Sequence, residues 1–441
     1  MPQIHINMID DRLVLTPIGS NRDEKRLANR VSKKRVTQEQ ALQQYNEGRA
    51  LLFFTQVLAN LPEPRRKQGI RYPLQTVVIT ALMAMICSAD DAEGMEFWGQ
   101  QNEHWLKEIL DMPYGAPTQD VYLRVFAVLD PEHLGEVMRA WANMIALKLK
   151  GMGKKHIAID GKTSRGSYDT AKEQPSIHTV SAWYREAGIV LGQVKTEQKS
   201  NEITAIPELL KKLDLKNAII TMDAMGCQAN IAKQITAGGG DFVLSVKENQ
   251  PSLHHDIKTA FQYGETCQTL KAHGKEPPLP QPILETHFEV DKGHGRLEER
   301  TVEVCRDLDW LSEHKEKWPG ISCFIKVTRK RTHLLSGKES VETAYYIASS
   351  LDGAEAMGLS IRGHWSIENN LHWVLDVAFR EDDARHRAKN AADNMTRLRQ
   401  FALSIIKQDK TRKLGVANSR KIAGWNPEYL IKLLMGHLSE N

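Results

Sequence analysis

In the first third of the chain, hydrophobic positions recur at the spacing of an α-helix. Helices are predicted at 74–88, 92–108 and 118–129. The stretch 74–88 is apolar almost throughout, so we expect it to be a buried core helix. Thr118 precedes Gln-Asp-Val-Tyr and is a candidate helix N-cap. The pattern predicts an all-α unit, preceded by a polar, poorly periodic arm.

Beyond Gly151 the pattern changes to short runs of β-formers. Strands are predicted at 156–160, 178–184, 189–195, 218–223 and 241–247, and helices at 201–213 and 228–236. The strands at 178–184 and 189–195 are close enough to form a hairpin. The resulting order is strand, hairpin, helix, strand, helix, strand, which is typical of an α/β core.

This alternation breaks between 249 and 343. A proline-rich loop at 271–282 is followed by β-rich segments, and helices are predicted again at 354–361 and 366–379. The order predicts a β-rich insertion within the α/β core. The expected domains are an arm (1–48), a helical, DNA-binding domain (49–150), the first part of the core (151–250), the insertion (251–344), the second part of the core with Glu368 (345–410) and a basic C-terminal segment (411–441).

Composition places the chain among ordinary globular proteins. Hydrophobic residues make up 41% and charged residues 26% of the 441 positions. The longest apolar run, 77–87, is shorter than the roughly 20 residues that span a bilayer. The N-terminus lacks the pattern of a secretion signal. Five cysteines without a C-x-x-C pair indicate free thiols in a reducing cytoplasm.

Charge is unevenly distributed, although the net charge is only +4. The stretch 385–421 holds eleven lysines and arginines against two acids, Asp393 and Asp409. Such a segment can neutralise phosphates, so we expect it to contact nucleic acid. A second basic run at 25–35 is better explained as a solvated face.

Three acidic residues have positions suited to phosphodiester chemistry. Asp160 and Asp223 each end a predicted strand, and Glu368 lies in a predicted helix. His364, Glu368 and His372 share one stripe of that helix at i, i+4 and i+8. Two divalent ions roughly 3.5–4 Å apart can activate a nucleophile and stabilise the leaving oxygen of a phosphodiester. Carboxylate ligands suit Mg²⁺ or Mn²⁺, so the three acids are candidate ligands and catalytic residues.

Residues in this helix and just after it are expected to have structural roles. Trp365 and Trp373 are expected to be core anchors. The acids at 381–383 are expected to pair with Arg385 and Arg387.

Several long motifs carry a family resemblance. They are AIDGKTSRGS, HTVSAW, QKSNEITAIPELL, TMDAMGCQ, VKENQP, DKGHGRLEERTVEV and HWSIENNLHWVLDVAFREDDARHR, with PEPRRKQGIRYPL and GAPTQDVYLRVFAVLD before them. The chain resembles the DDE transposases of the ISAs type, also known as H-repeat-associated proteins of Rhs elements. The resemblance covers about residues 50–410.

The resemblance implies an RNase H-like catalytic core with a β-rich insertion, preceded by an all-α domain. It implies that Asp160, Asp223 and Glu368 form a catalytic triad that binds Mg²⁺ or Mn²⁺. The implied reaction is cleavage at transposon ends followed by strand transfer into target DNA. We therefore expect double-stranded DNA as the partner and a homodimer on DNA, in the bacterial cytoplasm and nucleoid.

DNA contacts are expected from donors close to the acids. Related transposases carry Tyr, Arg and Lys around the catalytic Glu, where this chain has Ile361, His364 and Leu375. Phosphate contacts must therefore come in part from other residues. The candidates are Lys162, Arg165, Lys247, Asn249, His364, His372, Arg385 and Arg387.

Two alternatives explain part of the pattern. The helical set His364, Glu368, His372 and Asp376 could ligate zinc or non-haem iron in another class of enzyme, although this leaves the strand-ending acids unexplained. The chain could instead be a captured, non-mobile H-repeat remnant that binds DNA without transposing. A bound-metal assay tests the first alternative, which predicts stoichiometric zinc or iron, and the second predicts DNA binding without metal-dependent nicking.

Overall fold

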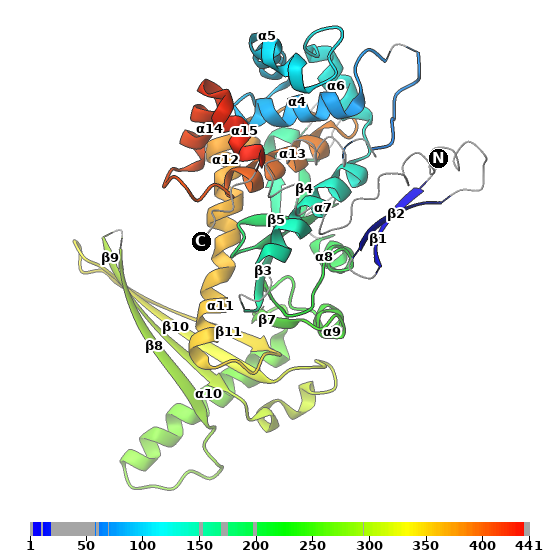
Figure 1. Cartoon of the computed structure of the whole chain (residues 1–441). Helices are drawn as coiled ribbons and strands as arrows, with labels where there is room; N and C mark the ends of the chain where they lie inside the picture. The colour runs from blue at the N-terminus through cyan, green and yellow to red at the C-terminus, as the bar shows by residue number, and fades with distance from the viewer. Residues whose placement is uncertain are drawn as a thin grey trace.

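The structure is a computed structural model that describes residues 3–9, 12–18, 58, 61–68, 70–149, 153–168, 175–196, 201–293 and 295–435. A large mixed sheet occupies the middle of the molecule, helices gather at one end, and long antiparallel strands project at the other (Figure 1). The basic run at 25–35 lies outside the described residues. No helix in the described ranges is long and apolar enough to cross a membrane. All five cysteines are free thiols.

Nine strands form one sheet in the order β5-β4-β3-β6-β7-β11-β10-β9-β8. The first five are β3 (Lys155–Ser164), β4 (Ile177–Tyr184), β5 (Ile189–Thr196), β6 (Ala218–Met222) and β7 (Asp241–Val246). β3, β4 and β5 are antiparallel neighbours, whereas β3, β6 and β7 run parallel. The short β-rich runs of the sequence thus form the predicted strands. They are largely buried because α8 (Glu202–Leu210) and α9 (Ala229–Ala237), with other helices, cover the sheet.

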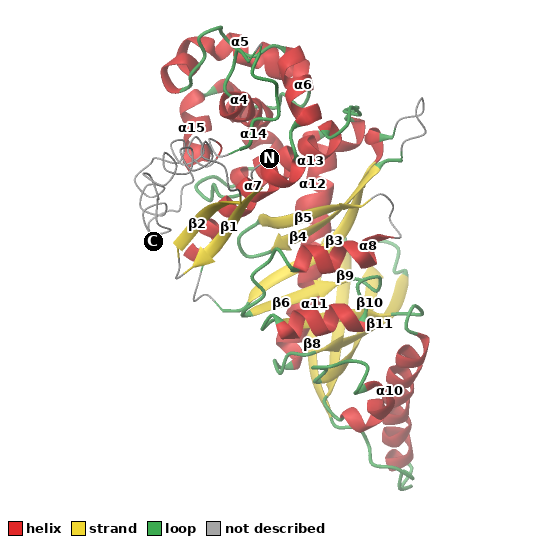
Figure 2. Ribbon diagram, turned by 90° about the vertical axis from the view of Figure 1, so that its right-hand side faces the viewer, coloured by secondary structure: helices red, strands yellow, loops and turns green. Residues whose placement is uncertain are grey.

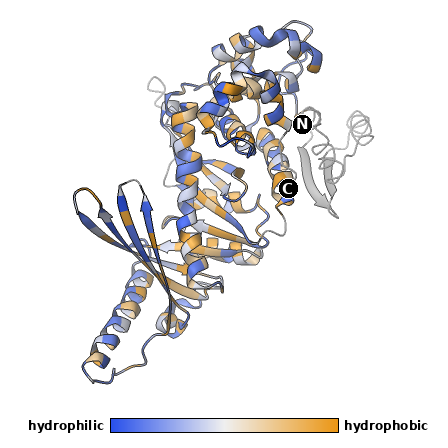
Figure 3. Ribbon diagram, turned by 60° about the vertical axis from the view of Figure 1, so that its left-hand side comes forward, coloured by the Kyte–Doolittle hydropathy of each residue, from blue (hydrophilic) through white to orange (hydrophobic). Residues whose placement is uncertain are grey.

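The insertion continues this sheet. Its strands are β8 (Leu284–Gly293), β9 (Arg296–Cys305), β10 (Cys323–His333) and β11 (Glu339–Ala348), preceded by α10 (Pro251–Ala272). All four strands are antiparallel neighbours, and β11 pairs with β7 from Tyr345 to Ala348. The outer halves of these strands are mostly hydrophilic, whereas hydrophobic residues gather in the central strands (Figure 3).

Four helices, α4 (Leu74–Ile86), α5 (Ala92–Ile109), α6 (Gln119–Val128) and α7 (Pro131–Lys148), cover the region predicted to be helical. The carboxylates of Asp91 and Asp130 cap α5 and α7 by accepting backbone N–H bonds. Thr118 stands at the N-cap of α6, but its side chain makes no capping bond. Near the N-terminus, β1 (Gln3–Ile9) and β2 (Arg12–Ile18) form a hairpin that the polar pattern of the arm did not predict.

The C-terminal helices return to this helical end (Figure 2). They are α13 (Ala391–Ile406), α14 (Val416–Trp425) and α15 (Pro427–Met435). Phe401 of α13 packs edge-to-face against Trp141 of α7, with ring centroids 5.2 Å apart. Arg397, Arg399 and Arg420 are buried here. The expectation that the basic segment contacts nucleic acid is therefore wrong for these three arginines, since folding turns them inward.

One long helical element links the insertion to the helical end (Figure 1). It consists of α11 (Ala354–Ile367), the π-helix η4 (Glu368–His372) and α12 (Trp373–Phe379). Arg380, in the left-handed conformation with φ of 49°, ends it. The predicted helix at 366–379 is therefore present, but it contains a π turn that periodicity did not reveal.

Candidate active site

Asp160, Glu368 and His372 form a compact cluster where β3 meets the long helix. One potential ligand atom from each lies within 4.8 Å of the other two. His372 Nδ1 is 2.8 Å from Glu368 Oε2 and 3.6 Å from Asp160 Oδ2. The imidazole is buried, whereas Glu368 is exposed at the rim. Residues 208 positions apart in the chain are thus brought into one potential metal site.

Asp223 lies beside this cluster on the neighbouring strand. Ile159 of β3 pairs with Met222 of β6, so the two aspartates that follow lie beside each other at the carboxyl end of β6. The expectation that Asp160 ends its strand is wrong, because β3 continues to Ser164 through its pairing with β4, and only Asp223 follows the end of a strand. Asp223 Oδ1 accepts backbone N–H bonds from Met225 at 3.0 Å and Gly226 at 3.3 Å. Asp223 is close enough to affect Asp160 electrostatically, although it is not in the compact group.

Burial and like charge make the site receptive to cations. Burial raises the pKa of Asp160 to about 6, and the charges of Asp223 and Glu368 act in the same direction, while His372 opposes them. The hydrogen bond from His372 lowers the pKa of Glu368. Three carboxyl groups are thus held close together against their mutual repulsion, and a bound cation would relieve it.

The π turn sets the position of Glu368. The backbone N–H of Trp373 bonds to the carbonyl of Glu368, five residues back, where a regular α-helix would bond four back. Leu371 anchors this turn in the core. π turns are frequently found at functional sites because they re-aim side chains, and here the turn begins at Glu368 and ends at His372.

His364 lies on the Asp223 side of the site. Its Nδ1 is 3.1 Å from Thr221 Oγ1, and the same hydroxyl is 3.0 Å from His156 Nε2. Burial lowers the pKa of His364 to about 4 and that of His156 to about 3. Both rings are therefore neutral at pH 7, so a contact from His364 to phosphate would be a neutral hydrogen bond.

Lys162 makes ion pairs inside the protein. Its Nζ is 2.6 Å from Asp376 Oδ1, 3.7 Å from Glu381 Oε2 and 3.8 Å from Asp382 Oδ1, and its side chain is only 10% exposed. Its contact with DNA stays a prediction. Arg165, in the short 3-10 turn that follows β3, is 84% exposed.

The acids at 381–383 do not have the partners expected from the sequence. Glu381 and Asp382 face Lys162, and Asp383 Oδ2 pairs with Arg380 Nε at 3.0 Å. The predicted pairing with Arg385 and Arg387 is wrong, because the chain turns sharply at Arg380. Arg385 is exposed and Arg387 half-buried, and neither forms an ion pair with another described residue. Their DNA contacts stay predictions.

A cavity of about 720 Å³ lies next to Asp223, which forms part of its lining. Its lining includes Lys247 and Asn249, both exposed, and Tyr345 of β11. The side-chain amide of Asn249 donates to the carbonyl of Ala224 at 2.6 Å. Two predicted DNA-contact residues therefore share a cavity with one of the three acids.

The two tryptophans beside Glu368 are not core anchors. Trp365 is 55% and Trp373 59% exposed. Ile367, Leu371 and Leu375 occupy the buried face of the helix instead, which turns both indoles toward solvent. The expectation of core packing is wrong for both residues.

Comparison with known proteins identifies the class. The family model described as "Transposase DDE domain" matches residues 151–405, and the model described as "DDE_Tnp_1-associated" matches residues 55–142. The chain belongs to the DDE transposase family.

Relatives from Escherichia coli match most of the chain. The "H repeat-associated putative transposase YhhI" of strain K12 is 35% identical over 378 residues, which are 85% of this chain and 96% of the relative. "Putative transposase YncI" of O157:H7 is 36% identical over 376 residues, or 85% and 92%. "Putative protein YbfL" of K12 is 35% identical with coverages of 85% and 96%.

A solved structure of the piggyBac transposase synaptic complex with hairpin DNA is a distant neighbour. It covers 87% of this chain and 81% of its own, at 11% identity and a TM-score of 0.40. This likeness is too low to define the fold of the present chain.

Proposed function

We propose that this protein is an insertion-sequence transposase that cleaves DNA strands at element ends and joins the freed 3′-hydroxyl to target DNA. The observation that carries the proposal is the proximity of Asp160, Asp223 and Glu368 at the carboxyl end of β6, beside β3. Membership of the DDE transposase family supports the same reaction class. We assign the three acids as catalytic residues.

The proposed core is RNase H-like. Its support is the order β5-β4-β3-β6-β7, in which an antiparallel hairpin joins three parallel strands. We keep the domain boundaries expected from the sequence, with 49–150 as a DNA-binding domain and 411–441 as a C-terminal segment. The insertion, 251–344, extends the core sheet.

The donor set fits Mg²⁺ or Mn²⁺. Carboxylate oxygens are their preferred ligands, and Asp160 is half-buried beside two other acids, with His372 as the cation opposing their charges. When bound, such ions activate the attacking water or hydroxyl and stabilise the leaving oxygen. Asp160, Glu368 and Asp223 would hold these ions through their carboxylate oxygens.

Exposed polar residues around the acids are proposed to hold double-stranded DNA. Lys247 and Asn249 line the cavity next to Asp223, and Arg165 projects from the loop after β3. Arg side chains bind phosphate oxygens in bidentate geometry. Strand transfer needs two element ends, so we propose a homodimer on DNA.

The alternatives receive less support. Asp376 is bonded to Lys162, and Asp160, rather than Asp376 or His364, completes the compact group in the described residues. This disfavours the purely helical zinc or iron site. All three acids are present, which disfavours a captured remnant that has lost catalysis by point mutation.

The test is cleavage of a labelled duplex that carries the element's own end, in Mg²⁺ or Mn²⁺, by wild type and Asp160→Ala. Nicking at the element end should vanish in Asp160→Ala while DNA binding remains. Asp309→Ala removes an aspartate that is 89% exposed and should nick like wild type. Binding without nicking in wild type would overturn the proposal and favour the captured remnant.

A further inference from the structure

We propose that His372 is a nitrogen ligand of the ion held by Asp160 and Glu368, and that Glu381 accepts a hydrogen bond from the other ring nitrogen. The site would then be a mixed oxygen and nitrogen site that favours Mn²⁺ over Mg²⁺. This inference rests on the proposed metal-dependent function and specifies its ligands. It gives His372 a role other than the DNA contact expected from the sequence.

The geometry of His372 is that of a ligand. Neighbouring ligands of an octahedral ion at 2.0–2.1 Å are separated by about 3 Å. His372 Nδ1 is 2.8 Å from Glu368 Oε2 and 3.6 Å from Asp160 Oδ2. The Asp160 and Glu368 oxygens lie within 4.8 Å of each other, so an ion bound between the three atoms would draw the two carboxylates together.

Burial argues against a DNA contact. The side chain of His372 is only 5% exposed, and its Nδ1 already faces two carboxylates. A phosphate would have to displace Asp160 or Glu368 to reach it. The ring is thus buried against the two carboxylates, whereas Glu368 is 52% exposed.

The environment behind the ring provides the second observation. His372 Nε2 is buried and has no hydrogen-bond partner among the described residues, and the same holds for both carboxylate oxygens of Glu381. Burial raises the pKa of Glu381, the charges of Arg399 and Lys162 oppose this, and His372 opposes it to a smaller extent. His372 and Glu381 thus act on each other electrostatically, and neither has another hydrogen-bond partner for these buried atoms among the described residues.

This pairing matches the usual support of a metal-bound histidine. When Nδ1 donates its electron pair to an ion, the neutral ring carries its proton on Nε2. Metal-ligating histidines almost always donate that N–H to a carboxylate, a carbonyl or water. Glu381 is 1% exposed and follows the chain reversal at Arg380, and its oxygens, which have no hydrogen-bond partner among the described residues, are the acceptors that we propose for this N–H once the ion is bound. We assign it as a positioning residue.

A nitrogen ligand changes the choice of metal. Mg²⁺ prefers oxygen ligands and near-ideal octahedral geometry. Imidazole nitrogen binds divalent first-row transition ions, of which Mn²⁺ is also suited to carboxylate oxygens, better than it binds Mg²⁺. The chain should therefore bind Mn²⁺ at least about tenfold more tightly than Mg²⁺, whereas an all-carboxylate site would discriminate less.

The test is pulsed electron paramagnetic resonance of Mn²⁺ bound to the full chain, which detects coupling to a ligand ¹⁴N nucleus. Wild type should show the coupling. His372→Gln should lose it and lose more affinity for Mn²⁺ than for Mg²⁺, since an amide oxygen replaces nitrogen. His364→Gln is the matched control on the same helix and should keep the coupling. Bound Mn²⁺ without coupling, coupling retained in His372→Gln, or no binding of Mn²⁺ at all would overturn the inference.

Glu381→Gln tests the positioning residue. It should keep the ¹⁴N coupling but weaken Mn²⁺ binding about tenfold, and Mg²⁺ binding less. Equal losses for both ions, or none, would remove Glu381 from the proposal. Nicking of DNA is measured separately: nicking without ¹⁴N coupling overturns only this inference, whereas coupling without nicking overturns only the proposed function.

Discussion

Arg420 and Asp90 form an ion pair that joins α14 to the turn between α4 and α5. The guanidinium of Arg420 also donates to the carbonyl of Met85 at 2.7 Å and to the carbonyl of Ala378, and it lies 4.0 Å from the ring centroid of Phe379. One side chain of α14 thereby holds the end of α4, the turn before α5 and the end of α12 together.

Replacing this arginine should destabilise the whole protein. Arg420→Met leaves Asp90 and two carbonyls without their donor, which costs about 3 kcal/mol for a buried pair. Urea unfolding measures the change. Lys421→Met, at an exposed neighbouring position, should change the free energy of unfolding by less than about 0.5 kcal/mol. Equal effects of the two changes would contradict the role of Arg420.

Asp160 should make the metal-free protein less stable as pH rises. Its pKa is raised to about 6 in the folded state from the ordinary value of 3.8, so between these values the folded state binds more protons than the unfolded state. Stability from this group is present below pH 4 and lost as pH rises through 6. In EDTA, Asp160→Asn should therefore be about 1–2 kcal/mol more stable than wild type at pH 8 and equal to it at pH 4. Unfolding at both pH values measures this, and the opposite order at pH 8 would rule it out.

Lys162 and Arg165 were both expected to contact DNA, but removing their charges should have different effects. Loss of the Lys162 charge should lower stability, whereas loss of the Arg165 charge should weaken DNA binding. Lys162→Met leaves Asp376, Glu381 and Asp382 without their shared cation, so it should cost about 3 kcal/mol of stability.

Arg165→Met should leave stability unchanged within about 0.5 kcal/mol. It should instead weaken binding to duplex DNA and reduce the salt slope of the affinity by about one. Unfolding and fluorescence anisotropy measure the two effects. A loss of stability in Arg165→Met as large as that in Lys162→Met would contradict the exposed position of Arg165.

The exposed tryptophans should matter little for stability. Trp365→Ala and Trp373→Ala should each cost less than about 1 kcal/mol, because more than half of each side chain is in solvent. Trp183→Ala is the matched comparison in the core and should cost about 3–5 kcal/mol. Urea unfolding tests all three. A core-sized loss at Trp365 or Trp373 would restore the packing role expected from the sequence.

Local sequence patterns were sufficient to predict the strands and the helix that carry the three acids. The β-rich runs before Asp160 and Asp223 are buried strands, and pairing of Ile159 with Met222 brings the two aspartates beside each other. The helix around Glu368 was also predictable, since its apolar residues recur at helical spacing.

Features that depend on distant partners were not predictable. Nothing in the spacing of Glu381 shows that the chain reversal at Arg380 places it near Lys162 and His372. Trp365 appeared to be a core residue because hydropathy alone does not tell which face of a helix a sheet will cover. The π turn depends on packing of Leu371, and the continuation of the sheet into the insertion depends on a pairing between β7 and β11, about a hundred residues apart.

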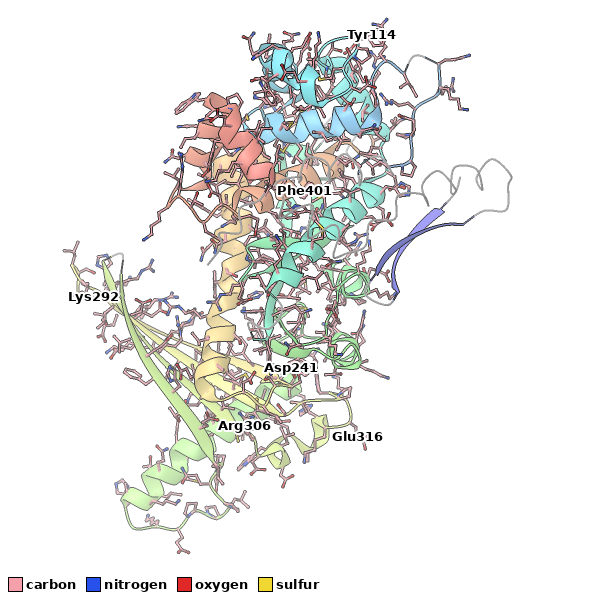
Figure 4. The ribbon with its side chains drawn as sticks, in the orientation of Figure 1. Tyr114, Asp241, Lys292, Arg306, Glu316 and Phe401 are labelled. Carbon is pink, nitrogen blue, oxygen red and sulfur yellow. The ribbon has the colours of Figure 1, made fainter. Side chains whose placement is uncertain are left out.

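The pairing of β11 with β7 fixes distances across the molecule. The hairpin of β8 and β9 carries Lys292 at its end (Figure 4). Backbone hydrogen bonds connect it through β10 and β11 to β7, in one continuous sheet. A strand of ten residues spans about 33 Å. Any DNA that touches both this hairpin and Asp160 is thus held at a spacing set by strand length, so adding or deleting residue pairs in β8–β11 changes where along the duplex the acids lie.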